Sequence, residues 1–314
     1  MTTEDLSGSC TMESLIPEDW NMIEQSSTVS MSRMMLRSKK LLHKMASIGI
    51  AVCLLTAVMT ASAASDSTVI QAEDVEWGYL NPLRGKLSPG AADLWGDRSK
   101  DMATGMLVRF NKGFSSPPHI HNISYRGVVI EGKMHNDDPG AESMWLPALS
   151  FWSQPAGENH ITAASGERNL IYLEIDSGPY LVQPAAQQFD NGERPINVHA
   201  DNLVWLDEQD LSFIHGPAVS VASLWQAGSG SGLHGSLLKL PAGFQGNLAT
   251  SAEEFRAVVI SGVLTLAEDA EAPVSKLSAG SYFSASGEVN YGFTTAVETV
   301  IYIRSDQSFT VMSN

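Results

Sequence analysis

Three histidines of this chain have a spacing that could bind a metal ion. His119 and His121 are separated by one residue, and His160 directly follows the turn-forming segment Pro155 to Asn159. Because successive side chains of a β-strand point to opposite faces, His119 and His121 would share one face, about 6–7 Å apart. Imidazole nitrogens bind zinc at about 2.0–2.1 Å. The spacing predicts a three-histidine site if a following strand returns His160 to the pair.

The elements that would position these histidines are predicted to be strands. From Val69 onward, short apolar or alternating segments end at Gly, Pro, Asn or Asp, and no long stretch has a helical period. Such a pattern is typical of strands joined by turns, and the segments are rich in the β-branched and aromatic residues that favour strands. We therefore predict an all-β fold. The clearest predicted strands are Met106–Phe110, Tyr125–Glu131, Leu170–Ile175, Ser236–Leu240, Phe255–Leu266 and Thr299–Arg304.

An internal repeat shows which part of the chain keeps the histidines. Residues 95–172, the first copy, match residues 225–302, the second copy, at a constant offset of 130 positions, which indicates a tandem duplication. His119, His121 and His160 correspond to Ala249, Ser251 and Asn290, so we expect a metal site in the first copy alone. The matched pairs include Trp95 and Trp225, Gly113 and Gly243, Phe114 and Phe244, Arg126 and Arg256, Gly132 and Gly262, Gly157 and Gly287, and Tyr172 and Tyr302.

The first 63 residues resemble an export signal. A basic cluster between Arg33 and Lys44 precedes the apolar segment Ala46–Val58, and the small residues up to Ala63 are typical of a signal-peptidase site. The apolar segment is shorter than the ~20 residues that span a bilayer, which favours cleavage over a membrane anchor. We therefore expect a periplasmic or secreted protein without stable membrane insertion after cleavage. The start codon stays open between Met1 and the later Met31, Met34 and Met35.

Charge and cysteine content narrow the set of partners. The chain has 35 acidic against 19 basic residues, a formal net charge of −16. Such a surface repels nucleic acid and anionic lipid, so neither is expected as a partner. Cys10 and Cys53 both precede the predicted cut, so the mature chain would have neither disulfides nor thiolate ligands. The sequence leaves open whether the protein forms a homodimer.

The histidines also lie within a recognisable motif. Gly113, His119, His121 and Gly132 fit the first motif of the cupins, and Pro155, Gly157 and His160 fit the second, Pro-x-Gly-x-x-His. Over residues 77–311 the chain resembles an uncharacterised two-cupin family, the DUF4437 type, which is related to the cupin half of ChrR-type anti-sigma factors. The segments that carry this second resemblance are Leu94–Asp97, Tyr125–Gly132 and His135–Pro139.

The resemblance implies a bicupin, with two small jelly-roll β-barrels. We assign residues 1–63 to the N-terminal extension and signal peptide, residues 66–180 to cupin domain 1 with the metal site, and residues 181–200 to a linker. Residues 201–314 would form cupin domain 2, which lacks the metal ligands.

The chain departs from the cupin motif at two positions. Tyr125 stands where the first motif has a glutamate ligand, and Ala164 where a residue such as asparagine follows the second-motif histidine. Without the glutamate, three neutral imidazoles leave the full charge on the metal, which favours an anionic or carbonyl-containing small ligand. Tyr125, Glu131 and His135 are the candidate catalytic residues. Glu131 shares the strand parity of Tyr125 and His135 follows the next turn, although the simpler interpretation of both is a polar surface residue near a loop.

Two function classes follow from this reasoning. The first is an exported metal-binding bicupin with dioxygenase-like activity, because three protein ligands leave metal positions open for substrate and for oxygen or water. The alternative is a non-catalytic zinc-binding sensor or ligand-binding cupin. Imidazole ligands suit Zn, Fe, Ni and Cu, and cupins also use Mn, so the sequence does not determine the divalent metal.

Overall fold

The computed structural model describes residues 66–228, 230–268 and 274–314, and these residues belong to one compact unit. The predicted signal peptide lies outside the described residues. No helix in the described ranges is long and apolar enough to cross a bilayer.

The all-β prediction is confirmed, since the only helices in the described part are three short 3₁₀ segments, η1 (Pro82–Leu87), η2 (Ala185–Gln187) and η3 (Ala200–Asn202). Five of the six clearest predicted strands each fall within one strand of the structure. The sixth, Phe255–Leu266, is two strands that meet at Gly262. This glycine has φ +79°, and a Cβ there would lie 2.4 Å from the Glu298 carbonyl oxygen. A tight turn therefore divides what the sequence pattern presents as one apolar segment.

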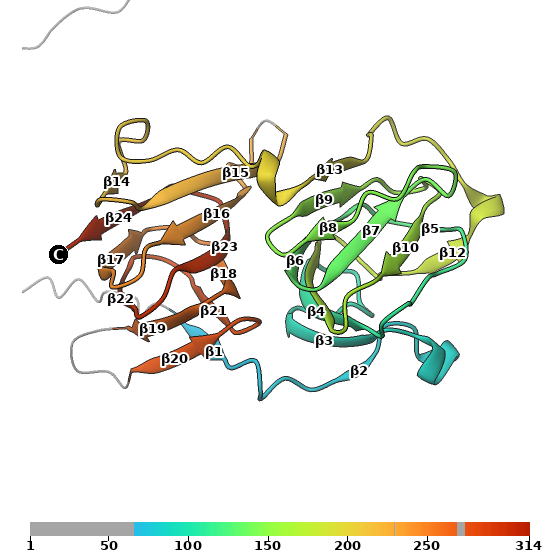
Figure 1. The fold of residues 1–314 in the computed structure, drawn as a ribbon, viewed down its shortest axis with the longest axis horizontal. Coiled ribbons are helices and arrows are strands. Elements are labelled where there is room, and N and C mark those ends of the chain that lie inside the picture. The colour runs from blue at the N-terminus through green and yellow to red at the C-terminus, as the bar shows by residue number, and fades with distance from the viewer. Residues whose placement is uncertain (1–65, 229, 269–273) are drawn as a thin grey trace, which may run out of the picture. The chain divides into compact units, whose positions relative to one another are not determined.

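The first copy contributes strands to one large sheet and two small ones (Figure 1). The large sheet has the order β13 (Ile196–Val198), β9 (Phe151–Gln154), β6 (Tyr125–Glu131), β11 (Asn169–Ile175), β4 (Thr104–Phe110), β3 (Gly90–Trp95) and β2 (Gly78–Tyr79). The small sheets are β10 (Ile161–Ala164), β7 (Lys133–Asp137) and β8 (Leu146–Pro147), and β12 (Val182–Pro184) with β5 (His119–His121).

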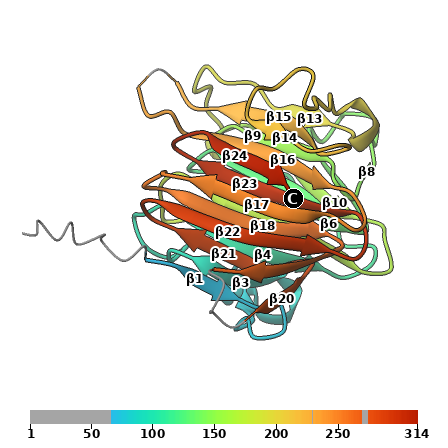
Figure 2. The ribbon, with the colours of Figure 1, turned by 90° about the vertical axis from the view of Figure 1, so that its left-hand side faces the viewer.

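The second copy repeats this strand order. Its first sheet is β1 (Thr68–Ile70), β21 (Tyr282–Ala285), β18 (Phe255–Ser261), β23 (Thr299–Ser305), β16 (His234–Leu240) and β15 (Ser220–Gln226). Its other sheet is β14 (Ile214–His215), β24 (Phe309–Ser313), β17 (Gln245–Thr250), β22 (Val289–Thr295), β19 (Val263–Ala267) and β20 (Ser275–Ser278), and Figure 2 shows several of these strands in face view. The order β9-β6-β11-β4-β3 thus recurs as β21-β18-β23-β16-β15. One strand crosses over, because β1 lies N-terminal to the first copy yet pairs with β21.

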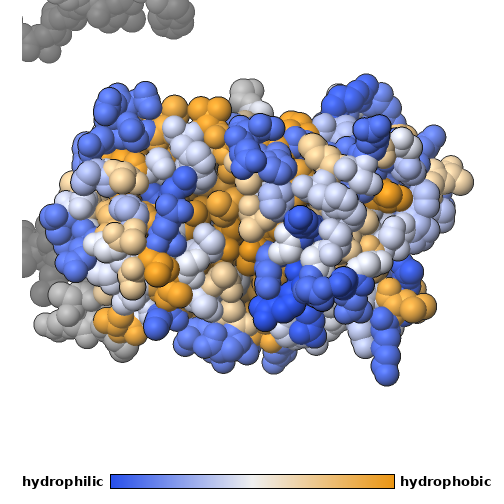
Figure 3. Space-filling view, in the orientation of Figure 1, coloured by the Kyte–Doolittle hydropathy of each residue, from blue (hydrophilic) through white to orange (hydrophobic). Residues whose placement is uncertain are grey.

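The described residues form three apolar cores. One lies between the first-copy sheets and includes Val129, Met134 and Ile171, and a second fills the interior of the second copy. The third joins the large sheets of the two copies and draws buried residues from both, such as Val128 and Val258. Figure 3 shows hydrophilic side chains around much of the rim of one face and hydrophobic ones exposed towards its middle.

Polar residues within the third core follow the sequence repeat. The Trp95 indole donates to the Tyr172 hydroxyl at 3.1 Å, and the Trp225 indole donates to the Tyr302 hydroxyl at 2.9 Å. The Arg126 guanidinium stacks on Trp225, 3.8 Å from the ring centre. Arg256, the counterpart of Arg126, stacks in turn on Trp95 at 4.0 Å. The arginine of each copy therefore stacks on the tryptophan of the other copy.

At one buried position between the two copies, the equivalent residues differ and carry opposite charges. Glu174 and Arg304 occupy equivalent positions, are 1% and 2% exposed, and form an ion pair at 3.3 Å. The Glu174 carboxylate also accepts hydrogen bonds from the hydroxyls of Tyr172 and Tyr302. Had both copies kept the same residue, like charges would meet inside the core. Opposite charges instead attract strongly there, since the surroundings exclude water.

We expect Arg304→Met to destabilise the protein by roughly 3 kcal/mol or more, because it removes a fully buried counter-ion of the Glu174 carboxylate and leaves that carboxylate with Arg126, 3.4 Å away. Urea unfolding followed by tryptophan fluorescence measures this change. The matched control is Arg168→Met, which removes an ion pair with Glu131 whose side chains are 80% and 42% exposed, and it should cost less than about 1 kcal/mol. Equal effects of the two substitutions would contradict a structural role for the buried pair.

Candidate metal centre

The backbone pairing of β5 brings the three histidines onto one face. His119 and His160 are directly opposite each other, and each backbone N–H donates to the other's carbonyl at 3.0 Å. Directly opposed residues of an antiparallel pair point their side chains the same way, and His121 shares that face because it is two residues from His119. In the second copy the equivalent pair, Ala249 and Asn290, belongs to a continuous ladder of six residue pairs. In the first copy the ladder is reduced to isolated bridges.

The three imidazoles converge in the interior. His119, His121 and His160 are 8%, 2% and 1% exposed, and one ligand nitrogen from each lies within 4.8 Å of the other two. The Nε2 atoms of His119 and His121 are 3.2 Å apart. The histidines predicted as ligands from their spacing therefore do meet at one point.

Backbone carbonyls fix the orientation of all three rings. The Nδ1 atoms of His119, His121 and His160 lie 2.9, 3.0 and 3.0 Å from the carbonyl oxygens of Pro117, Leu181 and Glu158. Because a carbonyl oxygen only accepts, this geometry assigns the ring proton to Nδ1 and leaves a lone pair on each Nε2. Metal-binding histidines are held in this way in many proteins.

Burial keeps these rings neutral. Burial lowers the pKa of His119, and the nearby positive charge of Arg84 lowers it further. Burial also lowers the pKa of His121 well below its ordinary value. Burial and the neighbouring His119 together lower the pKa of His160 to about 3. At neutral pH, each ring therefore carries one proton, and that proton is already engaged by a carbonyl.

This arrangement fits a divalent cation. Two Nε2 lone pairs at 3.2 Å repel one another unless a proton or a cation lies between them, and the lowered pKa values disfavour the proton. The donor set of three neutral imidazoles is also one that zinc, iron, nickel and copper accept. His119, His121 and His160 would hold the ion, with their Nδ1–H groups bonded to the backbone behind them.

Two tyrosine hydroxyls face the same point. The Tyr125 hydroxyl lies 3.2 Å from Nε2 of His160 and donates to Asn136 Oδ1 at 2.9 Å, and the Tyr180 hydroxyl lies 3.2 Å from Nε2 of His121. Burial raises the pKa of both phenols, so both stay protonated. They can hydrogen-bond a ligand beside the metal but are poor anionic ligands for it. Tyr125 was singled out from the sequence, whereas Tyr180 lies in a segment of loop composition that gave no indication of it.

The other two candidate catalytic residues lie elsewhere. Glu131 is paired with the exposed Arg168, and a β-bulge in the β6–β11 ladder separates Val129 from Glu131, which breaks the alternation that would have kept Glu131 on the Tyr125 face. His135 is 3% exposed and packs near Trp145, with Nδ1 3.3 Å from the Met144 carbonyl oxygen. Neither residue lines the cavity described next.

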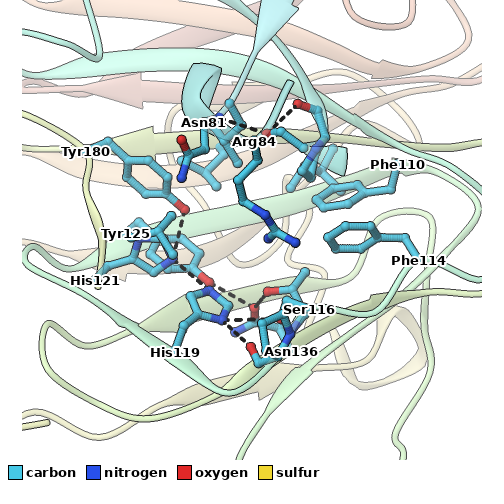
Figure 4. A pocket seen from close by; sticks show the side chains of 18 of the residues that line it. Asn81, Arg84, Phe110, Phe114, Ser116, His119, His121, Tyr125, Asn136 and Tyr180 are labelled. Atoms are coloured by element: carbon cyan, nitrogen blue, oxygen red, sulfur yellow. Dashed lines mark hydrogen bonds between the residues drawn. The ribbon is translucent and has the colours of Figure 1, made fainter. Parts of the chain in front are cut away.

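A cavity of about 70 Å³ lies against two of the three histidines, His119 and His121 (Figure 4). With ~10–15 Å³ of such volume for each water, it has room for a few waters or a small ligand. Asn136, which accepts from Tyr125 and Thr162 and donates to Gln154, forms part of its polar wall. The remaining walls are largely apolar and include Leu80, Phe110, Phe114, Trp152, Ile171, Leu173 and Val182.

The second copy has no comparable site among its described residues. Its interior is an apolar core that contains Leu248, Phe255, Phe283 and Phe293, and Phe255 stands where the first copy has Tyr125. Buried aromatic rings occupy this interior, and the three histidine-equivalent positions hold Ala249, Ser251 and Asn290 in place of imidazoles. This packing is consistent with the expectation of a metal site in the first copy alone.

Comparison with solved structures shows the class of fold. A candidate dioxygenase from Nostoc punctiforme superposes with a TM-score of 0.58 at 15% identity, covering 79% of this chain and 86% of that one. The protein Ylba from E. coli gives a TM-score of 0.53 at 13% identity, covering 77% and 92%. Oxalate decarboxylase from Lactobacillus farciminis, solved as a formate complex, gives 0.52 at 10% identity, covering 78% and 88%. Together with the motif, these likenesses show that the chain has a cupin-like fold.

The particular family follows from the sequence. Residues 68–312 match the family described as a domain of unknown function, DUF4437, and the chain therefore belongs to that family. No curated protein matches the chain. The resemblance inferred from the histidine motifs is thus confirmed at the level of the fold and the family.

The buried, neutral His160 leads to a pH-dependent stability of the metal-free protein. Below pH 6.5 the unfolded chain protonates this ring, whereas the folded chain does not until about pH 3, so folding loses stability as the pH falls through this window. The loss should approach about 1.4 kcal/mol per pH unit. His160→Asn, which introduces the second-copy residue, removes this contribution. Urea unfolding in EDTA at pH 7 and pH 5 should show wild type losing about 2 kcal/mol more than the variant, and equal losses would contradict the assignment.

Proposed function

We propose that the protein is a metal-dependent cupin in which His119, His121 and His160 bind one divalent ion and the adjoining cavity binds a small molecule. The observation that carries the proposal is the convergence of three Nε2 lone pairs whose Nδ1 protons are all engaged by backbone carbonyls. Such an arrangement is orientated for a cation before the cation arrives, which reduces the reorganisation that binding requires.

The reaction that this site supports best is a dioxygenase-like oxidation. A metal bound by three neutral ligands supplies a Lewis acid with open coordination positions. The chain's own residues shape what binds there: Tyr125 and Tyr180 provide hydroxyl groups, and Phe110 and Phe114 exclude water from one wall. The likeness to the candidate dioxygenase from Nostoc punctiforme supports the fold on which such chemistry occurs.

We propose further that the chain is exported and acts in the periplasm or outside the cell, and that its two copies are two cupin domains. The composition of residues 1–63 supports export, and the recurrent strand order of the two copies supports the domain division. In this division β1 is an exchanged strand, because it precedes the first domain and pairs within the second.

Elemental analysis tests the metal centre. Wild-type protein should contain about one equivalent of a transition metal, whereas His119→Ala and His160→Ala should each lose most of it, because two imidazoles bind far more weakly than three. His135→Ala is the matched control, since His135 is also a buried histidine of the first copy but lies outside the cavity, and it should keep its metal. Full metal content in both site variants would overturn the assignment. The analysis also identifies the metal.

Oxygen uptake separates an enzyme from a sensor. Iron-loaded protein incubated with a panel of β-diketones and phenols should consume oxygen with at least one of them, and His121→Ala should abolish that uptake. Ligand binding without oxygen uptake across the panel would instead favour the non-catalytic zinc-binding alternative.

A further inference from the structure

Arg84 brings a positive charge into the cavity of the histidine centre. It belongs to η1, which precedes the first strand of the sequence repeat, and it lines the same cavity as His119, Tyr125 and Tyr180. Figure 4 shows its side chain extending from η1 into the space between the two phenylalanines on one side and Tyr125 and Tyr180 on the other. The metal and the guanidinium would therefore act on the same bound molecule.

No acidic residue balances this charge within the cavity. The described residues that line it include no aspartate or glutamate, although the whole chain has 35 acidic residues. Within the described part of the chain, the Arg84 guanidinium forms neither an ion pair nor a hydrogen bond, in contrast to those of Arg98 and Arg126, which both pair with acidic side chains. A guanidinium offers five N–H donors and stays charged, so an anion is its natural partner in a largely apolar cavity.

The position of Arg84 is set by polar contacts rather than by packing. Asn81 Oδ1 accepts from the Leu83 N–H at 3.1 Å, and the Ser88 hydroxyl accepts from the Asn81 N–H at 2.8 Å, which fixes both ends of η1. Leu83 and Leu87 of the same helix are 97% and 74% exposed and contribute little to the core. The helix thus contributes Arg84 to the cavity while its leucines stay in solvent.

The charge of Arg84 also reaches the histidines, since it contributes to the lowered pKa of His119. Arg84 is itself exposed, which places it at the solvent side of the cavity. A metal ion at His119 and the guanidinium would add two sources of positive potential to one small, largely apolar cavity. Charge complementarity there favours an anion over a neutral molecule of the same shape.

We propose that the cavity binds a small carboxylate, with the carboxylate group held by Arg84 and a second oxygen of the same molecule directed to the metal. A guanidinium matches a carboxylate through two parallel hydrogen bonds, which favours this anion over a halide. The apolar walls formed by Phe110, Phe114 and Leu80 suit a short hydrocarbon part, and the volume of about 70 Å³ limits its length. This inference rests on the metal centre proposed above.

Calorimetric titration of the metal-loaded protein with 2-oxobutyrate and with its neutral amide, 2-oxobutyramide, tests the proposal. The two probes share a keto oxygen and an ethyl group and differ in charge. Wild type should bind the carboxylate at least about 10-fold more tightly than the amide, and Arg84→Gln should lower carboxylate affinity by about 10–100-fold while leaving amide binding nearly unchanged. Arg84→Lys, which keeps the charge without the two-pronged geometry, should be intermediate.

Lys86→Gln is the matched control. Lys86 is a cation of the same short helix but does not line the cavity, so its loss should leave the preference for the carboxylate intact. The proposal is overturned if Arg84→Gln binds 2-oxobutyrate as tightly as wild type, or if wild type does not distinguish the two probes. Metal content is measured on the same samples. Wild-type protein without metal would refute the metal centre, whereas the charge preference and its dependence on Arg84 are read from the titration in either case.

Discussion

The buried contact between Glu174 and Arg304 is the interaction on which the arrangement of the two copies depends. Both side chains are almost fully removed from water, so each depends on opposite charges beside it, and each is a partner of the other. Arg304 also reaches Asp176 and Glu254, which extends the pair into a network between β11 and β23. Any displacement of one large sheet relative to the other would separate these charges in a low-dielectric core, and the network therefore resists it.

The strands β6 and β11 connect this interface to the histidine centre, because their two faces contact different parts of the molecule. On one face, Tyr125, Ile171 and Leu173 line the cavity. On the opposite face, Val128 and Tyr172 pack into the core shared with the second copy. The second copy thus forms a rigid support behind the strands that shape the cavity. Its own interior is filled with aromatic side chains, which is consistent with a supporting role and leaves the chemistry to the first copy.

The histidine centre itself depends on the backbone as much as on the imidazoles. The carbonyls of Pro117, Leu181 and Glu158 come from three separate segments, and together they determine which nitrogen of each ring faces inward. Around the rings the backbone pairing is reduced to isolated bridges, whereas the unbroken β17–β22 ladder of the second copy includes Ala249 and Asn290 at the equivalent positions. Arg84 then adds a fixed charge from outside the repeat.

The sequence by itself determined the all-β fold, the family and the three histidines, because each depends on short-range periodicity. The two-residue period of a strand places His119 and His121 together, and the Pro-x-Gly-x-x-His spacing indicates a turn that returns His160 to them. The same periodicity misplaced Glu131, because a bulge arises from how β6 pairs with β11 and leaves no mark in local spacing. Tyr180 and Arg84 reach the cavity from segments that are irregular or 3₁₀-helical, and their positions depend on contacts with distant residues. Local pattern sets which side chains share a face of a strand, whereas only tertiary packing decides which faces meet and what charge lies between them.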